Sequence, residues 1–513
     1  MSMKSILRNG LVIVLALAFV FAGTTMAMAE EEESRVVIGS GAEAPGLDTR
    51  AEVDIPAFER INLISEPLIV FDFDLGLEPA LAEDWEYSED GTELTFYLRE
   101  GVMFHHGREF VADDVKYTIE WILDEDNDAA NRDLYAAIEE VEVVNDYEVT
   151  LHLSEVNTFL INNIARFGIV PRDKGEELGE DFGNEPVGTG PYVFESWDRD
   201  DRMILEAHED YWGGTPNFDV VEFRAITEDS ARLLAFEAGE IDMYQGGVVP
   251  DELARLEDDP DVDVYRTPGT GYSYVGFDNE EGPMTDKNLR KAVSHMLNRE
   301  AIVEHVMQGI GEVGQSQIMP NMPWFHEDLD FIGYDPEKAQ EYFQNSIAAE
   351  EDVEIRIFTN ENPVRMQIAE IMEYELGEIG IDVEVVIEEW GAFLDRIYDT
   401  NDYEMFILGW GGQMDPDRAS YRQFHSEGSA NHINFTNDRM DELLEEGRTV
   451  DPNSERSIEI YREVQEILNE EAPKAFINYT EEVALVQPEF EGFEIHSYSA
   501  NAWLSVPFLE RAE

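Results

Sequence analysis

The residues best suited to chemistry or to ligand binding are concentrated in one segment, "YEMFILGWGGQMDPD" (403–417). Its apolar run ends at Trp410, and Gln413 and Asp415 follow shortly afterwards. Carboxylates that a strand delivers to a cleft are suited to general acid–base catalysis. An indole face instead stacks on a ligand while its N–H donates a hydrogen bond, and Gly412 lets the backbone approach that ligand closely. The segment is therefore compatible with catalysis or with binding alone.

A purely structural interpretation of the same residues is also open. Trp410 is the kind of residue that fills a core, and paired glycines are typical of a turn. Asp415 and Asp417 flank a proline, as turn and helix-capping residues often do. The choice among these interpretations depends on the rest of the chain.

The chain contains none of the short motifs that mark common catalytic sites, namely HExxH, CxxC and the GxSxG nucleophile elbow. The glycine pairs in "VGTGPY" and "PGTGYSY" complete neither a dinucleotide-binding pattern nor a P-loop. A carboxylate pair for glycoside hydrolysis stays open, because 114 acidic residues offer many pairs whose distances the sequence does not reveal. Binding without chemistry is favoured, and a secreted glycan hydrolase is the alternative from another class.

The N-terminus predicts export. Lys4 and Arg8 precede a short apolar core (11–23), and "AMA" (27–29) forms a cleavage site, so we expect a secretory signal peptide that is cut after Ala29. The apolar core is shorter than the roughly 20 residues of a membrane span, which disfavours an uncleaved anchor. The chain has no cysteine, and it therefore uses neither disulfides nor a cysteine-linked lipid anchor. These features favour a periplasmic protein.

The net charge of −80 excludes nucleic acid and anionic membranes as favourable partners. The acidic residues are interleaved with apolar positions along the whole chain, unlike a disordered acidic tail. Their mutual repulsion largely disappears at about 1 M salt, where the screening length falls to roughly 3 Å. We therefore predict a halophilic protein; calcium storage would need repeated acidic clusters, which the sequence lacks.

Alternating hydrophobic patterns predict a mixed α/β protein without internal repeats or low-complexity linkers. The elements that matter for the candidate residues are an apolar strand ending at Trp410 and a second strand delivering Trp390. Further strands are expected over 92–104, 262–278 and 381–390, and helices over 111–124, 285–307, 362–380, 437–450 and 454–473.

Four blocks in order along the sequence resemble one family, the bacterial extracellular solute-binding proteins of family 5. These proteins are the dipeptide, oligopeptide and nickel receptors of ABC importers. The blocks cover nearly all of the chain that follows the signal peptide. They are 77–121, 184–243, 276–307, and the opening segment 403–417 together with 432–448.

The resemblance implies an α/β, two-lobed periplasmic-binding-protein fold of the type II-like kind, with an extra subdomain in the larger lobe and a hinge of two crossing strands. The ligand is held by hinge closure, so we expect no cofactor and no enzyme activity. We expect a monomer that delivers a small-molecule or peptide ligand to an ABC-importer membrane permease. The implied parts are the signal peptide (1–29), lobe I (30–275 plus 485–513) with its subdomain (66–185), lobe II (276–484), and crossing strands at 272–278 and 476–486.

The resemblance also implies two anchors for a dipeptide, and this sequence departs from both. An Asp three places after Trp410 would pair with the ligand's amino terminus, but Gln413 occupies that place, and Asp415 is a candidate substitute. The Arg expected just ahead of an Asn-Pro pair is missing; Thr359 and Asn360 lie in that neighbourhood, and Arg365 follows the proline. An oligopeptide is therefore favoured over a dipeptide, with an oligosaccharide as the alternative on the same fold.

The remaining candidates come from strand ends. We expect Trp390, Glu43 and Tyr272, together with Gly412, to line the cleft. His425 raises the possibility of nickel binding, but it is isolated, and Ni²⁺ prefers several nitrogen or sulfur ligands. No metal site is predicted.

Overall fold

The computed structural model describes residues 34–512, except for residues 128 and 352. The predicted signal peptide (1–29) therefore lies outside the described residues. None of the helices in the described part of the chain combines the length and apolar character needed to cross a bilayer.

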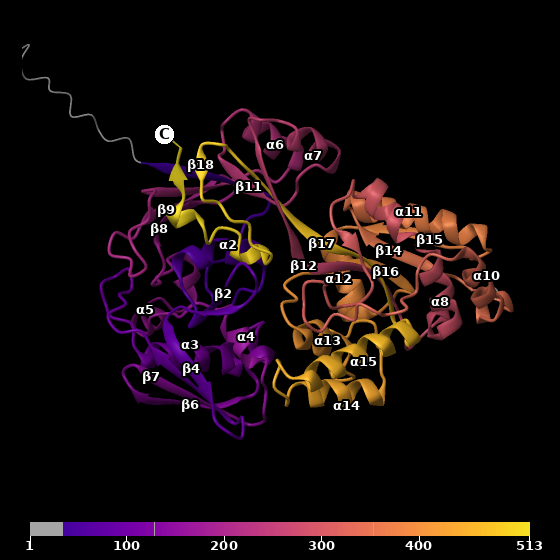
Figure 1. Ribbon diagram of the computed structural model, residues 1–513, viewed down its shortest axis with the longest axis horizontal. Helices are drawn as coiled ribbons and strands as arrows, with labels where there is room; N and C mark the ends of the chain where they lie inside the picture. The colour runs from indigo at the N-terminus through magenta and orange to yellow at the C-terminus, as the bar shows by residue number, and fades with distance from the viewer. Residues whose placement is uncertain (1–33, 128, 352, 513) are drawn as a thin grey trace, which may run out of the picture.

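A single mixed sheet runs through both halves of the molecule (Figure 1). Its strand order is β15-β14-β16-β12-β17-β11-β1-β10-β9-β8, with β13 paired to β17. The predicted mixed α/β class is confirmed. The strands are β1 (Arg35–Ser40), β8 (Tyr192–Asp198), β9 (Arg202–Ala207), β10 (Val220–Ala225), β11 (Met243–Gln245), β12 (Asp263–Phe277), β13 (Glu312–Val313), β14 (Arg356–Asn360), β15 (Glu384–Glu388), β16 (Met405–Trp410) and β17 (Lys474–Val486).

The long strands β12 and β17 join the two halves. They pair antiparallel from Asp263 opposite Val486 to Gly276 opposite Lys474, and Figure 1 shows them crossing the middle of the molecule. Their register shifts after Pro268, which cannot donate to the ladder. A side chain at Gly271 would put its Cβ 2.6 Å from the Trp410 carbonyl oxygen. The glycines of "PGTG" thus allow β12 to change register and to approach the Trp410 carbonyl closely.

The first half, indigo to magenta in Figure 1, also carries a separate antiparallel sheet in the order β4-β5-β7-β6. Its period-two pattern is visible in β5, where Leu94, Phe96 and Leu98 are buried and the residues between them are more exposed. The other elements of this half are β2 (Ile69–Phe71), β3 (Leu77–Pro79), β4 (Ala82–Tyr87), β5 (Glu93–Leu98), β6 (Ile138–Asn145), β7 (Glu148–Leu153), α2 (Ile55–Ile64), α3 (Ala112–Leu123), α4 (Leu160–Ile164), α5 (Arg172–Leu178), α6 (Asp229–Glu237) and α7 (Pro250–Glu257). After β17 the chain returns to this half and forms β18 (Phe490–Glu491) and β19 (Glu510–Arg511).

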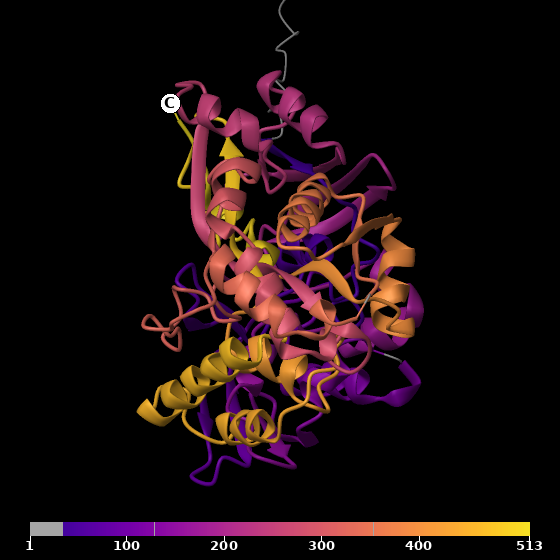
Figure 2. The same ribbon diagram turned by 90° about the vertical axis from the view of Figure 1, so that its right-hand side faces the viewer.

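The second half, orange in Figure 2, surrounds its strands with helices whose starts follow from capping residues. Asn362 caps the helix that begins at Pro363, and this helix ends just before Gly380, which has φ +92°. The strand predicted over 381–390 is shorter than expected, because Glu389 accepts hydrogen bonds from Gly391 and Ala392 and thereby starts a helix at Trp390. The helices are α8 (Lys287–Met296), α9 (Arg299–Ala301), α10 (Pro336–Gln344), α11 (Pro363–Glu378), α12 (Trp390–Asp395), α13 (Pro416–Phe424), α14 (Asp438–Gly447) and α15 (Glu455–Glu471).

The glycine pair in "VGTGPY" is explained by packing against the end of α2. A Cβ at Gly188 would lie 2.1 Å from the carbonyl oxygen of Ile64, and one at Gly190 would lie 2.6 Å from that of Leu63. Gly190 also donates its backbone N–H to the Ile64 oxygen at 2.9 Å. These are backbone atoms, which cannot move aside as a flexible side chain would, so this approach requires glycine.

Gly188→Ala is therefore expected to lower the free energy of unfolding by at least about 2 kcal/mol, because the added methyl group overlaps a fixed carbonyl. The matched control is Gly377→Ala in α11, where a Cβ meets nothing within 4 Å; it is expected to stabilise the protein by about 0.5–1 kcal/mol. Thermal unfolding of both variants in the same buffer tests this. Equal stability of the two would contradict the packing argument.

Candidate functional site

Trp410 lies at the end of β16, beside the crossing strand β12. It stands opposite Tyr272 in the register of the two strands. Its indole N–H donates to the hydroxyl of buried Tyr274 at 3.1 Å, and its ring is nearly parallel to that of His432, with centroids 6.5 Å apart. The side chain is half-buried. The ring is thus fixed in orientation while part of it stays accessible.

Three other predicted residues form one group at the same strand ends. Arg365 donates from Nη1 to Oδ1 of Asn360 at 3.0 Å, and its guanidinium lies 5.8 Å from the ring centroid of Trp390. Nη2 of Arg365 lies 3.8 Å from the place that a Cβ on Gly409 would occupy, next to Trp410. Burial lowers the pKa of Arg365, whereas the Trp390 side chain is 45% exposed. The structure therefore brings Asn360, Arg365 and Trp390 together, close to the end of β16 that carries Trp410.

Gln413 and Tyr272 belong to a separate, buried hydrogen-bond network. Gln413 donates to the Gly411 carbonyl at 2.7 Å and accepts from Gln423 at 3.4 Å. Oε1 of Gln423 in turn accepts from the Tyr272 hydroxyl at 2.6 Å and from Nζ of Lys474 at 2.8 Å. Burial lowers the pKa of the Lys474 ammonium. Lys474 was missed because it looks like the polar first residue of a strand.

Gly412 marks the place where the two halves meet. It has φ +65°, and a Cβ there would lie 3.1 Å from the ring of Tyr498 and 3.8 Å from Nη2 of Arg166, both in the first half. Its carbonyl oxygen accepts from Nε of Arg418 at 2.8 Å. Arg166, Arg418 and Tyr498 were not predicted, since no local pattern links residues so far apart in the sequence.

Asp415 is the N-cap of α13, and its carboxylate accepts from the backbone N–H of Arg418 at 2.8 Å. The side chain is buried, and this burial, with a smaller contribution from the charge of Asp417, raises the pKa of Asp415 to about 6. Asp417 is itself paired with Arg448, with Nε and Oδ1 2.8 Å apart. The helix-capping interpretation of Asp415 is confirmed.

A cavity of about 110 Å³ lies between α13 and the first half, and polar contacts connect the two halves around it. Asp133 of the first half pairs with Nε of Arg422 at 3.1 Å and accepts from the Ser429 hydroxyl at 2.8 Å. The Thr158 hydroxyl donates to the Val450 carbonyl at 2.9 Å. The two halves are thus in direct contact in this structure.

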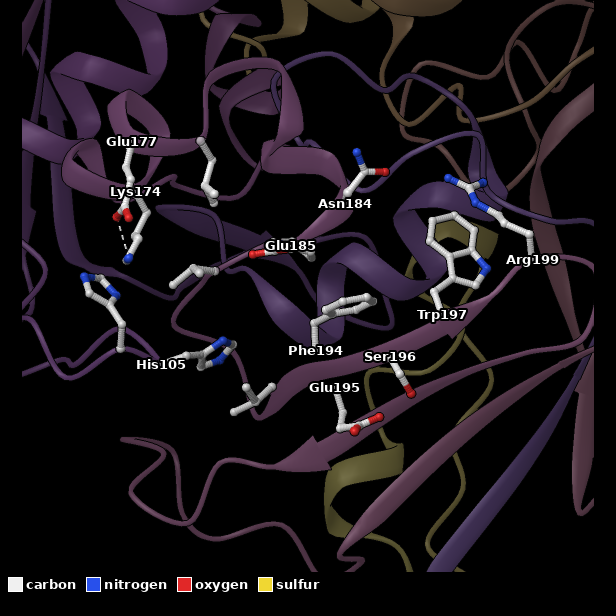
Figure 3. A pocket seen from close by; sticks show the side chains of 15 residues that line it. His105, Lys174, Glu177, Asn184, Glu185, Phe194, Glu195, Ser196, Trp197 and Arg199 are labelled. Carbon is white, nitrogen blue, oxygen red and sulfur yellow. Dashed lines mark hydrogen bonds and ion pairs between the residues drawn. The ribbon is translucent and has the colours of Figure 1, made fainter.

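Glu43 lies apart from the Trp410 group. Its Oε1 accepts from the indole N–H of Trp197 and from the backbone N–H of Asp200, both at 2.9 Å. Trp197 and Arg199 stand at one end of a groove of about 670 Å³ in the first half, and His105 lies toward its other end (Figure 3). Neither Glu43 nor any other predicted site residue is among those that line this groove. Glu43 therefore has a local hydrogen-bonding role.

Two carboxylates near the crossing strands bear on the hydrolase alternative. Burial raises the pKa of Glu59 on α2 and of Glu482 on β17, each to about 7, and the charge of Glu482 contributes to the shift of Glu59. A glycoside hydrolase needs one protonated and one ionised carboxyl group, so their environments should separate the two pKa values. Here burial shifts both in the same direction, which gives that alternative no support.

The described residues contain no group of three or more His, Asp or Glu side chains that could hold a metal ion. His425 stacks on Tyr421 with ring centroids 4.4 Å apart, and its Nε2 lies 3.6 Å from Oε1 of Glu445. It therefore has ordinary packing partners.

Two halves joined by paired crossing strands, with aromatic and hydrogen-bonding residues where they meet, define a two-lobed binding protein. The chain belongs to the bacterial extracellular solute-binding proteins, family 5 (Middle), whose sequence model matches residues 76–432. The predicted family and fold are confirmed.

Known relatives differ in the ligands that their names state. The chain is 26% identical to the dipeptide-binding protein of Escherichia coli K12 over 81% of this chain and 83% of that protein. It is 28% identical to heme-binding protein A of Haemophilus influenzae over 84% of each. The structure of the oligopeptide-binding protein AppA of Bacillus subtilis, in complex with a nonapeptide, matches with a TM-score of 0.82 and 25% identity, covering 93% of this chain and 99% of that one.

The raised pKa of Asp415 predicts a pH-dependent effect of neutralising it. The native state disfavours the ionised carboxyl group, so its contribution to stability falls as the pH rises from about 4 through 6. Asp415→Asn keeps the capping acceptor and is expected to be more stable than the native protein by roughly 1–3 kcal/mol at about pH 8, and by less near pH 5.

Thermal unfolding at the two pH values tests this, with Asp415→Ala as the control that loses the cap at both. A lower stability of Asp415→Asn at about pH 8 would show that the ionised carboxylate is itself needed.

Proposed function

We propose that this protein is an extracytoplasmic receptor that captures an oligopeptide between its two halves and delivers it to the membrane permease of an ABC importer. The observation that carries the proposal is the placement of Trp410, Asn360, Arg365 and Trp390 at the strand ends beside the crossing strands. Relatives named for dipeptide and oligopeptide binding support the ligand class. The protein acts by binding and closure, without catalysis or cofactor.

The local chemistry favours a longer peptide over a dipeptide. Position 413 carries a neutral, buried glutamine, and the arginine that the family resemblance implies near Asn360, to hold a dipeptide's carboxylate, is missing. A longer peptide can be held through its backbone in an extended form, with aromatic faces packing on its side chains. The loop after β16 and the buried network hold the ligand-binding residues in place; they include Gly412, Gln413, Asp415 and Tyr272.

The proposed division into parts follows the crossing strands. Lobe I comprises 30–275 and 485–513, lobe II comprises 276–484, and an extra subdomain occupies 66–185. The first two boundaries fall at the ends of β12 and β17, and the four-stranded sheet lies inside the proposed subdomain. The predicted signal peptide (1–29) and the absence of a cysteine for a lipid anchor support a periplasmic location, and we propose a monomer.

The test of the function is to purify the protein gently from a high-salt culture, release any bound ligand and weigh it by mass spectrometry. Masses that differ by amino-acid residues support the proposal. Hexose or pentose increments would assign the same cleft to an oligosaccharide, and turnover of a glycan would make the protein a hydrolase.

Trp410→Ala is expected to weaken binding of the released ligand by roughly 1–2 kcal/mol or more, about 5- to 30-fold, because a buried aromatic anchor is lost. Isothermal titration calorimetry measures the change. Trp85→Ala is the matched control, since Trp85 is also half-buried but lies in the four-stranded sheet. Unchanged affinity of Trp410→Ala would remove this residue from the site.

We also propose that the protein is halophilic. Its 114 acidic residues face only 34 Lys and Arg, so most carboxylates have no cationic partner, and their repulsion is screened over about 10 Å at 0.1 M salt but over about 3 Å at 1 M. Cooperative thermal unfolding, followed by circular dichroism, is expected only at about 1 M KCl and above. A stable fold at about 0.1 M KCl would contradict this.

A further inference from the structure

Arg166 is a buried cation with unused hydrogen-bond donors. Its side chain follows α4 in the first half and is 7% exposed. Nη2 donates to the Tyr498 hydroxyl at 2.8 Å, whereas Nε and Nη1 have no partner among the described residues. Leaving a buried charged donor unpaired is costly, so such groups are normally hydrogen-bonded.

A second guanidinium approaches the same place from the other half. Arg418, in the first turn of α13, donates from Nε to the Gly412 carbonyl, and its Nη1 has no partner in the part of the chain that the structure describes. Nη2 of Arg166 lies 3.8 Å from the position of a Cβ on Gly412. The two guanidinium groups therefore border Gly412 from opposite sides of the junction.

Neither arginine forms an ion pair with a carboxylate of the described chain, although their neighbours do. Arg422 pairs with Asp133, and Arg448 with Asp417, around the cavity of about 110 Å³ that Arg418 also lines. Asp415 lies close to Arg418 but caps its backbone N–H. Burial, together with the charge of Arg166, lowers the pKa of Arg418 to about 9. In a chain with 114 acidic residues, two adjacent cations without an ion-paired carboxylate, Arg166 buried and Arg418 half-buried, are conspicuous.

We propose that Arg166 and Arg418 form a subsite for a carboxylate group of the ligand, contributed jointly by the two halves. The inference rests on the proposed function and narrows its ligand to peptides that place a carboxylate at Gly412. Planar guanidinium donors match the two oxygens of a carboxylate. Gly412 is itself buried, and its lack of a side chain lets Tyr498 and Arg166 approach the loop closely. The carboxylate belongs to the peptide's C-terminus or to an acidic side chain.

Three defined pools of pentapeptides built from Ala, Leu and Phe separate these sources: one with free C-termini, one amidated, and one amidated with a single internal Glu. Equilibrium dialysis at about 2 M KCl, read by mass spectrometry, gives the affinities. The native protein is expected to bind the free-acid pool, or the Glu-containing amide pool, at least about tenfold more tightly than the plain amide pool. Whichever pool is preferred identifies the source of the carboxylate.

Arg166→Gln and Arg418→Gln are each expected to abolish that preference, lowering affinity for the carboxylate-bearing pool about 10- to 100-fold and for the plain amide pool less than about twofold. Arg439→Gln is the control, since Arg439 is an exposed arginine paired with Glu463; it should keep the preference. If a Gln variant does not fold, the Lys variant keeps the charge and should retain part of the preference.

Equal affinity of the native protein for all pools would overturn the subsite but leave the peptide-receptor function intact. An equal loss for all pools in the Gln variants would show that the arginines are structural, and would also overturn it. Failure of every pool to bind, with sugars released from the purified protein, would overturn the proposed function and this inference with it.

Discussion

The pairing of β12 with β17 is the constraint on which the site depends. These strands carry one sheet from the first half into the second, and Tyr272 lies opposite Trp410 on one side and Tyr479 on the other. A residue at the end of β16 is thereby placed at the junction by backbone hydrogen bonds. The kink after Pro268, with Gly271 against the Trp410 carbonyl, brings the loop that follows β16 close to the crossing strands. The pairing register of β12 with β16 and β17 therefore determines where Trp410 and the loop after it lie.

The charges where the two halves meet differ in sign and in solvent exposure from those on the surface. On the surface, acidic residues greatly outnumber cations, and at high salt their long-range field is screened. Long-range electrostatic attraction of a ligand is then weak. Recognition depends on direct contacts with buried groups, which salt screens much less. The buried Arg166 of the proposed subsite is such a group. An acidic exterior and unpaired arginines where the two halves meet are therefore compatible features of one protein.

Local chemistry was predictable from the sequence wherever a short pattern determines it. The strand ending at Trp410, the helix following Asn362 and the capping role of Asp415 all follow from spacing and from the residue before a proline. The start of α12 at Trp390 was missed, because an acidic residue after a strand has several possible roles. Pattern could identify each element but not the partner of each side chain.

The contacts that complete the site lie beyond such patterns. Arg166 and Tyr498 are 332 residues apart, and only the return of the chain to the first half after β17 brings them together. For Glu43, its place near a strand end predicted that it lines the cleft. In the structure its carboxylate instead accepts hydrogen bonds from Trp197 and Asp200. Long-range pairing depends on the whole fold, whereas residue type alone indicates only what a side chain is able to do.

The neutral side chain of Gln413 affects the charge of the buried network around it. A carboxylate at this position would stand next to Gln423, one hydrogen bond from the Lys474 ammonium, and would make that part of the junction negative. With a neutral amide there, Lys474 is the ionisable member of the buried network, and its own burial lowers its pKa and disfavours its charged form. The raised pKa values of Glu59 and Glu482 further reduce negative charge close to the crossing strands. The carboxylates near the crossing strands and α13 are thus either ion-paired or have raised pKa values, which is the environment that the proposed carboxylate subsite requires.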